Sequence, residues 1–370
     1  MRTGHVKAGL DCHMVGGHET GNETWIRGLV KGFQELDGDF ELVAYHVGSP
    51  WAPGSEQISF AKLRTANPAF RLGVELPWRS KRDRLDVLHT TYVVPGWSAV
   101  PVVVSVHDIS YVAHPEWFSP RDLRVLTRAV PWSIARAAHV HTVSEYSRRE
   151  IIEAYGVPPE KITAIASGPG PAGEPISFED ARVELAAIGV VAARPYLLAV
   201  GNLQPRKNLI RLIEAYNRLL SARRIDVDLL IVGPSHFRAH EIVQAADAAA
   251  GRIRFTGYVG DRQLAACYRC AAAFIFPSLY EGFGSPPLEA MAHGLPVASS
   301  SAGSLPEVCG AAALFFDPFQ VDSIANALEK ILGDSALRER LTEAGRARVA
   351  GYSWKSNAAR ILDLYREFVD

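Results

Sequence analysis

Two carboxylates enclose a stretch of glycine and proline between residues 281 and 289, where the chain reads EGFGSPPLE. Glu281 follows the run AFIFPSLY, whose apolar start is typical of a buried strand. A helix is expected to begin near Ser285, because proline suits the first turn of a helix. Glu289 would then lie in or just past that turn. The segment therefore indicates a strand-to-helix loop with a carboxylate at each end.

This loop is suited to hold a phosphate that has hydroxyl groups on both sides. Glycines let the backbone approach a ligand closely, and free amides at the start of a helix favour an anion. The residues expected to do this are Gly282, Phe283, Gly284 and Ser285. Since a carboxylate accepts hydrogen bonds from paired hydroxyls, one glutamate on a ribose and the other on a sugar would match a sugar nucleotide. The alternative is a plain glycine turn with a capping glutamate.

A basic pair forms the second candidate element, in the stretch GNLQPRKNL at residues 201–209. Arg206 and Lys207 come just after the apolar run YLLAVG, so they are expected beyond the end of another strand. Two cations there would neutralise the charge that develops on a departing diphosphate. A solvated basic pair is the alternative, because charged residues are common in exposed loops. The presence of both elements on one sheet edge favours a diphosphate site.

The composition indicates a globular protein with two domains. The chain has 370 residues, more than a single core usually organises, and 48% of them are hydrophobic and 21% charged. Its 39 basic and 40 acidic residues give a formal net charge of -1, which offers no electrostatic footprint for nucleic acid. Four cysteines are too few for a disulfide framework, and the CxxC pair Cys267 and Cys270 lacks further zinc ligands at convincing spacing.

Strand and helix patterns alternate along the chain, which predicts an α/β fold of doubly wound parallel sheets. The first half contains the apolar runs ELVAYHV, DVLHTTYVV, PVVVSVHD and HVHTVS. One helix among them is expected to begin with a capping box at Ser147 and Glu150 and to stop at Gly156. The glycine- and proline-rich residues 167–175 separate these runs from a second alternating series. The last helical pattern, residues 354–369, is amphipathic and is expected to pack away from the second core.

Several of these stretches resemble one enzyme family. VGNLQPRKNL, FTGYV, FPSLYEGFGSPPLEAMAHGLPVASS and SLPEVCGAAALFFDP resemble the C-terminal domain of family 4 of the retaining glycosyltransferases, whose E-x7-E motif falls at Glu281 and Glu289. VHDISYVAHPEWF and HTVSEYSRREI resemble the N-terminal domain of its mannosyltransferase-like branch. The resemblance covers nearly the whole chain.

The resemblance implies the GT-B fold. That fold has two facing Rossmann-like domains with the active site in the cleft, and a terminal helix that crosses back to the first domain. The expected acceptor-side domain comprises residues 1–168 plus 353–370. The expected nucleotide-sugar-binding domain comprises residues 169–352.

The resemblance also implies roles for single residues. Arg206 and Lys207 would clamp the donor diphosphate, Glu281 would orient hydroxyls of the transferred sugar, and Glu289 would bind the ribose diol. Neither the serine at position 285, where leucine is expected, nor the unusual interdomain stretch SGPGPAGEP removes a charged group that this chemistry needs.

Further donor contacts follow from the same resemblance. The backbone around Tyr258 and Val259 would contact the base, and His107 would lie near the donor sugar and the acceptor. A hydrogen-bonded histidine at a strand end is the alternative for His107. The first βα loop, MVGGHETGNET, would press glycines against the donor phosphates. It is longer than the usual family loop, so the contact falls to Gly16 and Gly17 or to their alternatives Gly21 and Asn22.

No metal and no cofactor are expected. The Asp-x-Asp pairs at residues 37–39 and 226–228 precede their strands, which places them at the amino ends, away from the ligand edge of each sheet. Arg206 and Lys207 would then take the role that a metal cation has in metal-dependent transferases.

The expected function is retaining transfer of a hexose from a nucleoside diphosphate sugar to a hydroxyl of a glycan or lipid-linked acceptor. Mannose from GDP-mannose is the first choice of donor, and donors of the UDP-glucose type come next. Two alternatives remain open, namely a nucleotide-sugar epimerase of the same fold and a non-catalytic nucleotide-sugar binding protein.

The expected location is cytoplasmic, because the chain begins without a secretory signal and contains no apolar stretch that would span a bilayer. Clustered basic residues would suit peripheral contact with the inner face of the membrane, and a solvated surface is the alternative. These residues are Arg79, Lys81, Arg82, Arg84, Arg121, Arg124 and Arg128.

Overall fold

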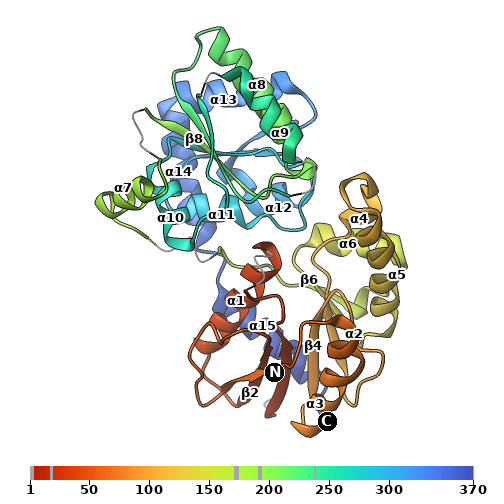
Figure 1. The fold of residues 1–370 in the computed structure, drawn as a ribbon. Coiled ribbons are helices and arrows are strands. Elements are labelled where there is room, and N and C mark those ends of the chain that lie inside the picture. The colour runs from red at the N-terminus through yellow and green to blue at the C-terminus, as the bar shows by residue number, and fades with distance from the viewer. Residues whose placement is uncertain are drawn as a thin grey trace. The chain divides into compact units, whose positions relative to one another are not determined.

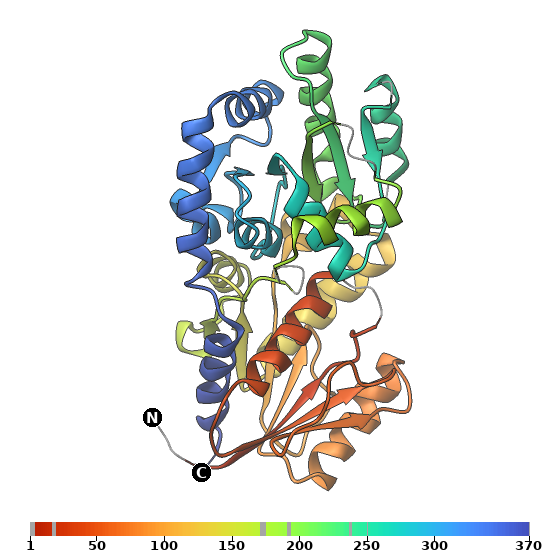
Figure 2. The ribbon, with the colours of Figure 1, turned by 90° about the vertical axis from the view of Figure 1, so that its left-hand side faces the viewer.

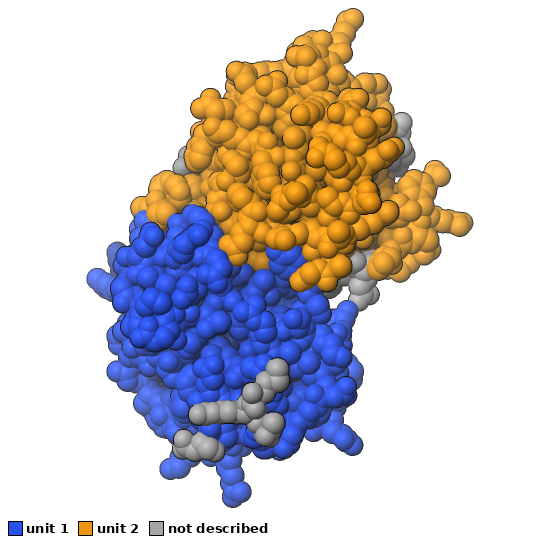
Figure 3. Space-filling view, turned by 180° about the vertical axis from the view of Figure 1, so that it is seen from behind, with its two compact units in different colours: residues 1–112, 120–168, 352–370 blue, residues 113–119, 169–351 orange. Residues whose placement is uncertain are grey.

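The chain forms two compact units, which Figure 3 shows in different colours. The structure is a computed structural model and describes residues 4–16, 20–170, 175–190, 194–236, 239–249 and 251–369. Unit 1 comprises Met1–Val112, Pro120–Gly168 and Tyr352–Asp370, and unit 2 comprises Ala113–Ser119 and Pro169–Gly351. Each unit contains one parallel sheet (Figure 1), as the alternation of strand and helix patterns predicts.

Unit 1 is built on a seven-stranded sheet in the order β3-β2-β1-β4-β5-β6-β7, in which all neighbouring strands are parallel. The strands are β1 (Val6–Asp11), β2 (Phe40–His46), β3 (Ile58–Lys62), β4 (Val87–Thr91), β5 (Val102–Ser105), β6 (His139–Thr142) and β7 (Ile162–Ala164). The strand order reverses between β1 and β4. In sheets of this kind ligands bind at the carboxyl ends of the strands beside such a switch point.

Helices of different lengths and one π-helical turn flank this sheet in the described part of the chain. They are α1 (Thr20–Gln34), α2 (Pro68–Phe70), a π-helical turn (Arg71–Glu75), α3 (Leu76–Arg82), α4 (Ser110–Ala113), α5 (Pro120–Arg136), α6 (Glu145–Tyr155) and α15 (Trp354–Arg366). A short 3-10 turn, Pro159–Lys161, precedes β7.

The C-terminal helix α15 packs on α1, and Figures 1 and 2 show the two helices side by side. Gly28 and Gly32 of α1 face Trp354, and a methyl group at either glycine would overlap that residue. The absence of side chains at these two positions therefore allows the close approach of the helices. The expectation that this helix packs away from the second core is confirmed.

The start of α6 differs from the prediction. Ser144 is the N-cap, and its hydroxyl accepts a hydrogen bond from the amide of Ser147 at 3.0 Å. The predicted capping box at Ser147 and Glu150 is therefore wrong, because Ser147 already lies in the first turn of a helix that begins three residues after β6 ends. Gly156 ends the helix as expected, with φ at 62° in the left-handed region.

Unit 2 contains a six-stranded parallel sheet in the order β10-β9-β8-β11-β12-β13. The strands are β8 (Tyr196–Val200), β9 (Asp228–Val232), β10 (Ile253–Phe255), β11 (Ala273–Phe276), β12 (Val297–Ser300) and β13 (Ala313–Phe316). All six match apolar runs of the second series in the sequence. Here the switch point lies between β8 and β11, so the loops that follow these two strands meet at the expected ligand edge.

Helices and short 3-10 turns complete unit 2. The helices are α7 (Phe178–Ala187), α8 (Leu209–Ser221), α9 (Ala239–Ala246), α10 (Asp261–Cys270), α11 (Ser285–Ala292), α12 (Leu305–Cys309), α13 (Val321–Gly333) and α14 (Ser335–Val349). The 3-10 turns are Pro115–Trp117, Pro205–Lys207, Asp247–Ala249 and Gly310–Ala312.

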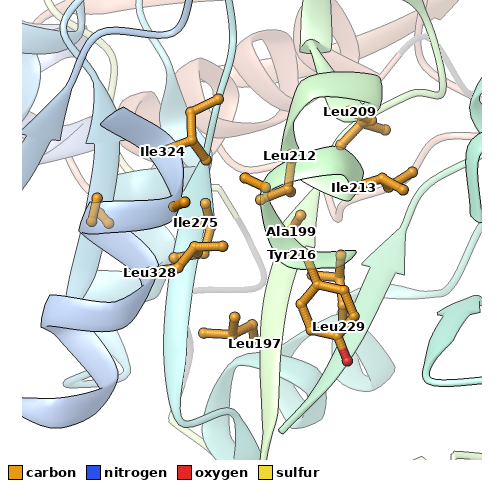
Figure 4. Close-up of a cluster of buried hydrophobic side chains, with 14 of the residues drawn as sticks. Leu197, Ala199, Leu209, Leu212, Ile213, Tyr216, Leu229, Ile275, Ile324 and Leu328 are labelled. Atoms are coloured by element: carbon orange, nitrogen blue, oxygen red, sulfur yellow. The ribbon is translucent and has the colours of Figure 1, made fainter. Parts of the chain in front are cut away.

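A hydrophobic core fills the space between this sheet and helices α8 and α13. Figure 4 shows Leu197 and Ile275 on the central strands, with Leu212 of α8 and Leu328 of α13 turned toward them. These four side chains are fully buried. The core therefore fixes β8 and β11, from which the two candidate loops extend.

The segment Ala113–Ser119 differs from the expected division of the chain. This segment was expected in the first domain, whereas the structure groups it with unit 2. The ring of His114 lies 6.3 Å from the ring of Tyr280 in an edge-on arrangement. Such a contact between distant parts of the chain leaves no trace in local hydrophobic periodicity.

Among the residues that the structure describes, no helix is both long enough and apolar enough to pass through a bilayer.

Candidate active site

The structure brings three of the predicted site residues together at the switch point of unit 2. Arg206 and Lys207 end a 3-10 turn after β8, and Glu281 lies in the loop after the neighbouring strand β11. Arg206 Nη1 lies 2.8 Å from Glu281 Oε2, and Lys207 Nζ lies 2.6 Å from Glu281 Oε1. The two cations and one carboxylate form a cluster, called here the charged triad, with a formal charge of +1.

Burial and charge together determine the state of the Glu281 carboxylate. Burial alone would raise the pKa of this group. The charges and hydrogen bonds of Arg206 and Lys207 together outweigh burial, so the pKa is lowered to about 2. The carboxylate is therefore ionised at neutral pH and accepts hydrogen bonds from both cations. Lys207 Nζ also lies 4.9 Å from the centre of the Phe276 ring, which restricts the ammonium group from a second side.

Asn208 anchors the loop that carries the two cations. This buried residue has φ at 56°, and its amide nitrogen donates to the carbonyl oxygens of Pro277 at 3.0 Å and Pro318 at 2.7 Å. The amide of Leu279 donates to the carbonyl oxygen of Arg206 at 2.9 Å. Asn208 was not among the predicted site residues, although asparagine at a turn between a 3-10 segment and a helix is a recognisable signal for positive φ.

The glycine-rich loop begins α11 as predicted. Helix α11 starts at Ser285, and Gly284 before it has φ at 95°, a conformation that favours glycine. Phe283 is buried. Ser304 braces the loop from the opposite side, since its hydroxyl lies 2.9 Å from the carbonyl oxygen of Glu281 and 2.8 Å from that of Phe283. Ser304 comes from the loop after β12, and no sequence pattern indicated its role.

Glu289 lies in a different environment from Glu281. It is buried in α11, and the hydroxyl of Tyr268 donates to its Oε2 atom at 2.9 Å. Burial raises the pKa of Glu289 to about 7, although the Tyr268 hydroxyl and the Gly170 amide act in the opposite direction. The ring of Tyr268 stacks on His293 with centroids 5.6 Å apart. Tyr268 is thus a further site residue that the sequence analysis missed.

The residues predicted to contact the base follow β10. The side chain of Tyr258 is 54% exposed, whereas Val259 is buried. Gly257 before them has φ at 71°, and its carbonyl oxygen accepts a hydrogen bond from the amide of Gly233 at 3.0 Å. This bond ties the loop after β10 to the end of β9. Contact of Tyr258 and Val259 with a base stays a prediction.

His107 and Gly16 belong to unit 1. His107 follows β5, and its ring lies 5.0 Å from that of Trp25. Burial lowers the pKa of His107 to about 4, so the imidazole is neutral at pH 7, and its buried Nε2 atom has no hydrogen-bond partner in the described part of the chain. Gly16 has φ at 88°, and its amide donates to Glu23 at 3.1 Å. Gly17 lies outside the described residues.

A directional series of hydrogen bonds crosses unit 1. His141 Nε2 lies 3.3 Å from the carbonyl oxygen of Ile165, which only accepts, so this nitrogen carries the hydrogen. His141 Nδ1 then accepts from the hydroxyl of Ser105 at 2.8 Å. The Ser105 oxygen accepts from His89 Nε2 at 2.7 Å, and His89 Nδ1 accepts from the hydroxyl of Tyr365 at 2.6 Å. The tautomers of His141 and His89 therefore both follow from the Ile165 carbonyl at the end of this hydrogen-bond series.

Replacement of Ser105 by alanine is expected to destabilise the protein by roughly 3 kcal/mol, because two fully buried imidazoles each lose a hydrogen bond. Urea unfolding at pH about 7 measures the change. Ser59→Ala, at an exposed position on β3, serves as the control and should lie within about 0.5 kcal/mol of the wild type. An equally small effect of Ser105→Ala would show that the hydrogen bonds through Ser105 contribute little to stability.

Asp228 and Asp39 of the Asp-x-Asp pairs lie close to basic side chains of other strands and loops. Asp228 lies 2.6 Å from Arg252 and 3.3 Å from Arg254, and Asp39 lies 2.6 Å from His5. Within the described ranges, no group of three His, Cys, Asp or Glu side chains is placed to hold a metal ion. A reaction without a metal stays a prediction.

Comparison with known proteins identifies the family. Residues 20–168 match the model of Glycosyltransferase Family 4, and residues 184–348 match that of glycosyl transferases group 1. O-antigen chain mannosyltransferase B of Escherichia coli is 34% identical over 266 residues, which cover 71% of this chain and 70% of that protein. The chain belongs to glycosyltransferase family 4. This family 4 glycosyltransferase is mannosyltransferase-like, as the sequence stretches quoted above predict.

Solved structures confirm the GT-B fold. Sucrose-phosphate synthase from Thermosynechococcus elongatus has a TM-score of 0.75 and 22% identity, with 98% of each chain covered. The Anabaena protein HepE in complex with UDP and glucose has a TM-score of 0.74 and 18% identity, with 97% of this chain and 99% of that chain covered. The two parallel sheets of the family 4 glycosyltransferase are therefore the Rossmann-like domains expected for that fold.

Proposed function

We propose that this family 4 glycosyltransferase transfers mannose from GDP-mannose to a hydroxyl of a glycan or lipid-linked acceptor, with retention of the anomeric configuration. The charged triad is the observation that carries the proposal. Arg206 and Lys207 are held by one ionised carboxylate at the switch point of a doubly wound sheet, where such folds bind ligands. Their net positive charge suits a nucleoside diphosphate.

The residues of the triad would divide the chemistry between them. The bond between C1 of the sugar and the diphosphate oxygen breaks, and a bond from C1 to the acceptor oxygen forms on the same face. The acceptor proton passes to the departing phosphate oxygen, while Arg206 and Lys207 stabilise the charge that develops there. Glu281 positions both cations and accepts hydrogen bonds from sugar hydroxyls. No protein nucleophile and no metal take part in this scheme.

The remaining candidate residues bind and orient the donor. Glu289 would accept hydrogen bonds from the ribose diol, and the backbone at Tyr258 and Val259 would contact the base. His107 would reach the donor sugar and the acceptor as a neutral imidazole, because burial lowers its pKa to about 4. Gly16 and its neighbour Gly17 would contact the phosphates.

The name of one relative supports mannose as the transferred sugar and a glycan as the acceptor. The Escherichia coli protein that is 34% identical over 266 residues is named as an O-antigen chain mannosyltransferase. A donor of the UDP-glucose type is the next choice, because the structurally similar HepE was solved with UDP and glucose.

The test is a donor panel with two readouts, thermal shift and turnover. GDP-mannose is expected to raise the melting temperature, because it binds only the folded state, and to be consumed only when a glycan acceptor is present. EDTA should leave turnover unchanged. Epimerised sugar nucleotide formed without an acceptor would establish the epimerase alternative instead. Binding without turnover on any acceptor would establish a binding protein, and activity that EDTA abolishes would contradict the metal-independent scheme.

We also propose that α5 contacts an anionic membrane surface. Val125 and Trp132 on this helix are 54% and 42% exposed, and the guanidinium of Arg136 lies 4.9 Å over the Trp132 ring. Arg121, Arg124 and Arg128 are exposed at helical spacing on the same side. Apolar and basic side chains in this arrangement suit a bilayer interface. Arg79 and Arg82 are less available, since Arg79 donates to the Lys62 carbonyl and Arg82 pairs with Asp83.

Vesicle sedimentation tests the membrane contact. Binding to phosphatidylglycerol vesicles and its loss in Trp132→Ala would support it, since the indole contributes apolar area at the interface. Equal sedimentation of both proteins, or of neither, would indicate that α5 is a solvated surface.

A further inference from the structure

A stacked aromatic pair lies in the segment Ala113–Ser119 of unit 2. The rings of His114 and Trp117 are nearly parallel, with an interplanar angle of 15° and centroids 3.8 Å apart. The 3-10 turn Pro115–Trp117 creates this arrangement, because side chains three residues apart eclipse each other in a 3-10 helix. We call these two residues the aromatic platform.

The platform is held in place before any ligand arrives. Pro115 fixes the start of the turn, and the amide of Trp117 donates to the carbonyl oxygen of His114 at 3.2 Å. Glu116 Oε1 lies 3.2 Å from His114 Nδ1, which restrains rotation of the imidazole. A rigid aromatic surface loses little conformational entropy on binding, so it is well suited to recognise a ring.

The platform adjoins the charged triad within the same unit. His114 meets the ring of Tyr280 edge-on at 6.3 Å, and Tyr280 directly precedes Glu281. The carbonyl oxygen of Tyr280 accepts a hydrogen bond from Arg206 Nη1 at 3.2 Å. Tyr280 is buried, whereas the His114 side chain is 32% exposed and Trp117 is partly exposed. A half-open aromatic surface thus lies next to the residue proposed to orient the transferred sugar.

The chemistry of this surface fits a pyranose ring. One face of such a sugar presents C–H groups with little polarity, and these pack on the electron-rich face of an aromatic ring. The platform carries no phosphate-binding cation of its own, whereas the triad beside it does. The nucleobase of the donor has another predicted location at Tyr258 and Val259, and a sugar that stacks beside Glu281 would lie close to the bond that is made.

We propose that His114 and Trp117 form the subsite that binds the sugar ring of the acceptor. The proposal rests on the glycosyltransferase function proposed above and adds to it the class of acceptor, a pyranoside whose C–H face is free to stack. It also assigns a functional role to the segment that the structure groups with unit 2.

The test uses the whole 370-residue chain and methyl α-D-mannopyranoside as the probe. Saturation-transfer NMR on the wild type should show contact with the sugar ring protons. Trp117→Ala should weaken binding about tenfold, whereas Trp117→Phe, which keeps an aromatic face, should stay within about threefold of the wild type. Trp78→Ala is the matched control, because Trp78 is an exposed tryptophan of unit 1 that packs under Arg82. It should bind the probe as the wild type does.

Turnover measurements separate the acceptor from the donor. In Trp117→Ala, hydrolysis of GDP-mannose by water and the affinity for GDP should be unchanged, while transfer to the mannoside should fall about tenfold through a higher KM. The proposal is overturned if the wild type does not bind the mannoside, if Trp117→Ala binds it normally, or if hydrolysis or GDP affinity falls with transfer. Probe binding that depends on Trp117 in a protein that turns over no donor would instead refute the proposed function and leave the subsite standing.

Discussion

Replacement of Lys207 by alanine is expected to lower kcat about 10²- to 10³-fold, the range found when one group that stabilises developing charge is removed. Lys207 acts on the diphosphate as it leaves, so the loss should appear mainly in kcat and less in donor affinity. Glu281 keeps Arg206 as a partner at 2.8 Å in this variant. Stability should therefore fall by no more than about 2 kcal/mol.

Steady-state kinetics and thermal unfolding of the same preparation check this result. Lys330→Ala removes an exposed lysine of α13 in the same unit and should leave both kcat and the melting temperature unchanged. Unchanged turnover in Lys207→Ala would remove the lysine from the proposed diphosphate clamp. A kcat loss of equal size in Lys330→Ala would show that the loss follows from the change in the protein's net charge and not from the position of Lys207.

The two glutamates of the E-x7-E motif are expected to affect stability with opposite pH dependence. The pKa of Glu281 is lowered to about 2 in the folded state, so its stabilising contribution is present above its ordinary pKa of 4.5 and is lost as pH falls toward 2. That shift corresponds to roughly 3 kcal/mol. Glu281→Gln should therefore be destabilising at pH about 7, and its deficit should shrink in acid.

Glu289 shows the reverse behaviour. Its folded-state pKa is raised to about 7, so the stability associated with its protonated form is present below 4.5 and is lost as pH rises through 7. Glu289→Gln, which mimics the protonated acid, should gain stability relative to the wild type above pH about 7 and match it near pH about 4.

Urea unfolding of the wild type and both variants across this pH range tests the pair. Each glutamine variant is the control for the other, because both replace a buried glutamate of the same motif by glutamine and only the expected pH dependence of stability differs. Parallel pH profiles for the two variants would show that the environments of the two carboxylates do not differ as the structure indicates. Donor affinity of Glu289→Gln, measured in the same series, would report on the proposed ribose contact separately.

Much of the fold could be predicted because its strands are buried. All six strands of unit 2 and the central strands β2, β4, β5 and β6 of unit 1 appear in the sequence as apolar runs. The central strand β1 was not among those runs. The edge strands β3 and β7 were missed. Only the first residue of each is fully buried, so neither shows the continuous apolar pattern of a strand covered on both faces.

The candidate site was predictable only in part, because its motifs are local and its contacts are not. The types and order of Arg206, Lys207, Glu281 and Glu289 were visible, and so was the start of α11 at Ser285. Their supports were not visible. Asn208, Ser304 and Tyr268 hold the loops and Glu289 through hydrogen bonds to residues that lie far away in the sequence.

The sequence by itself determined which segments become strands and helices, and that a basic pair and two carboxylates follow strands of one sheet. Only the tertiary structure decided that β8 and β11 are neighbours, which places Glu281 against both cations. It also decided that the pKa of Glu289 differs from that of Glu281, and that the His114 and Trp117 rings belong to unit 2. The physical reason is that periodicity records which residues face a core. Strand order, by contrast, depends on how whole layers pack, and it alone selects which distant loops meet.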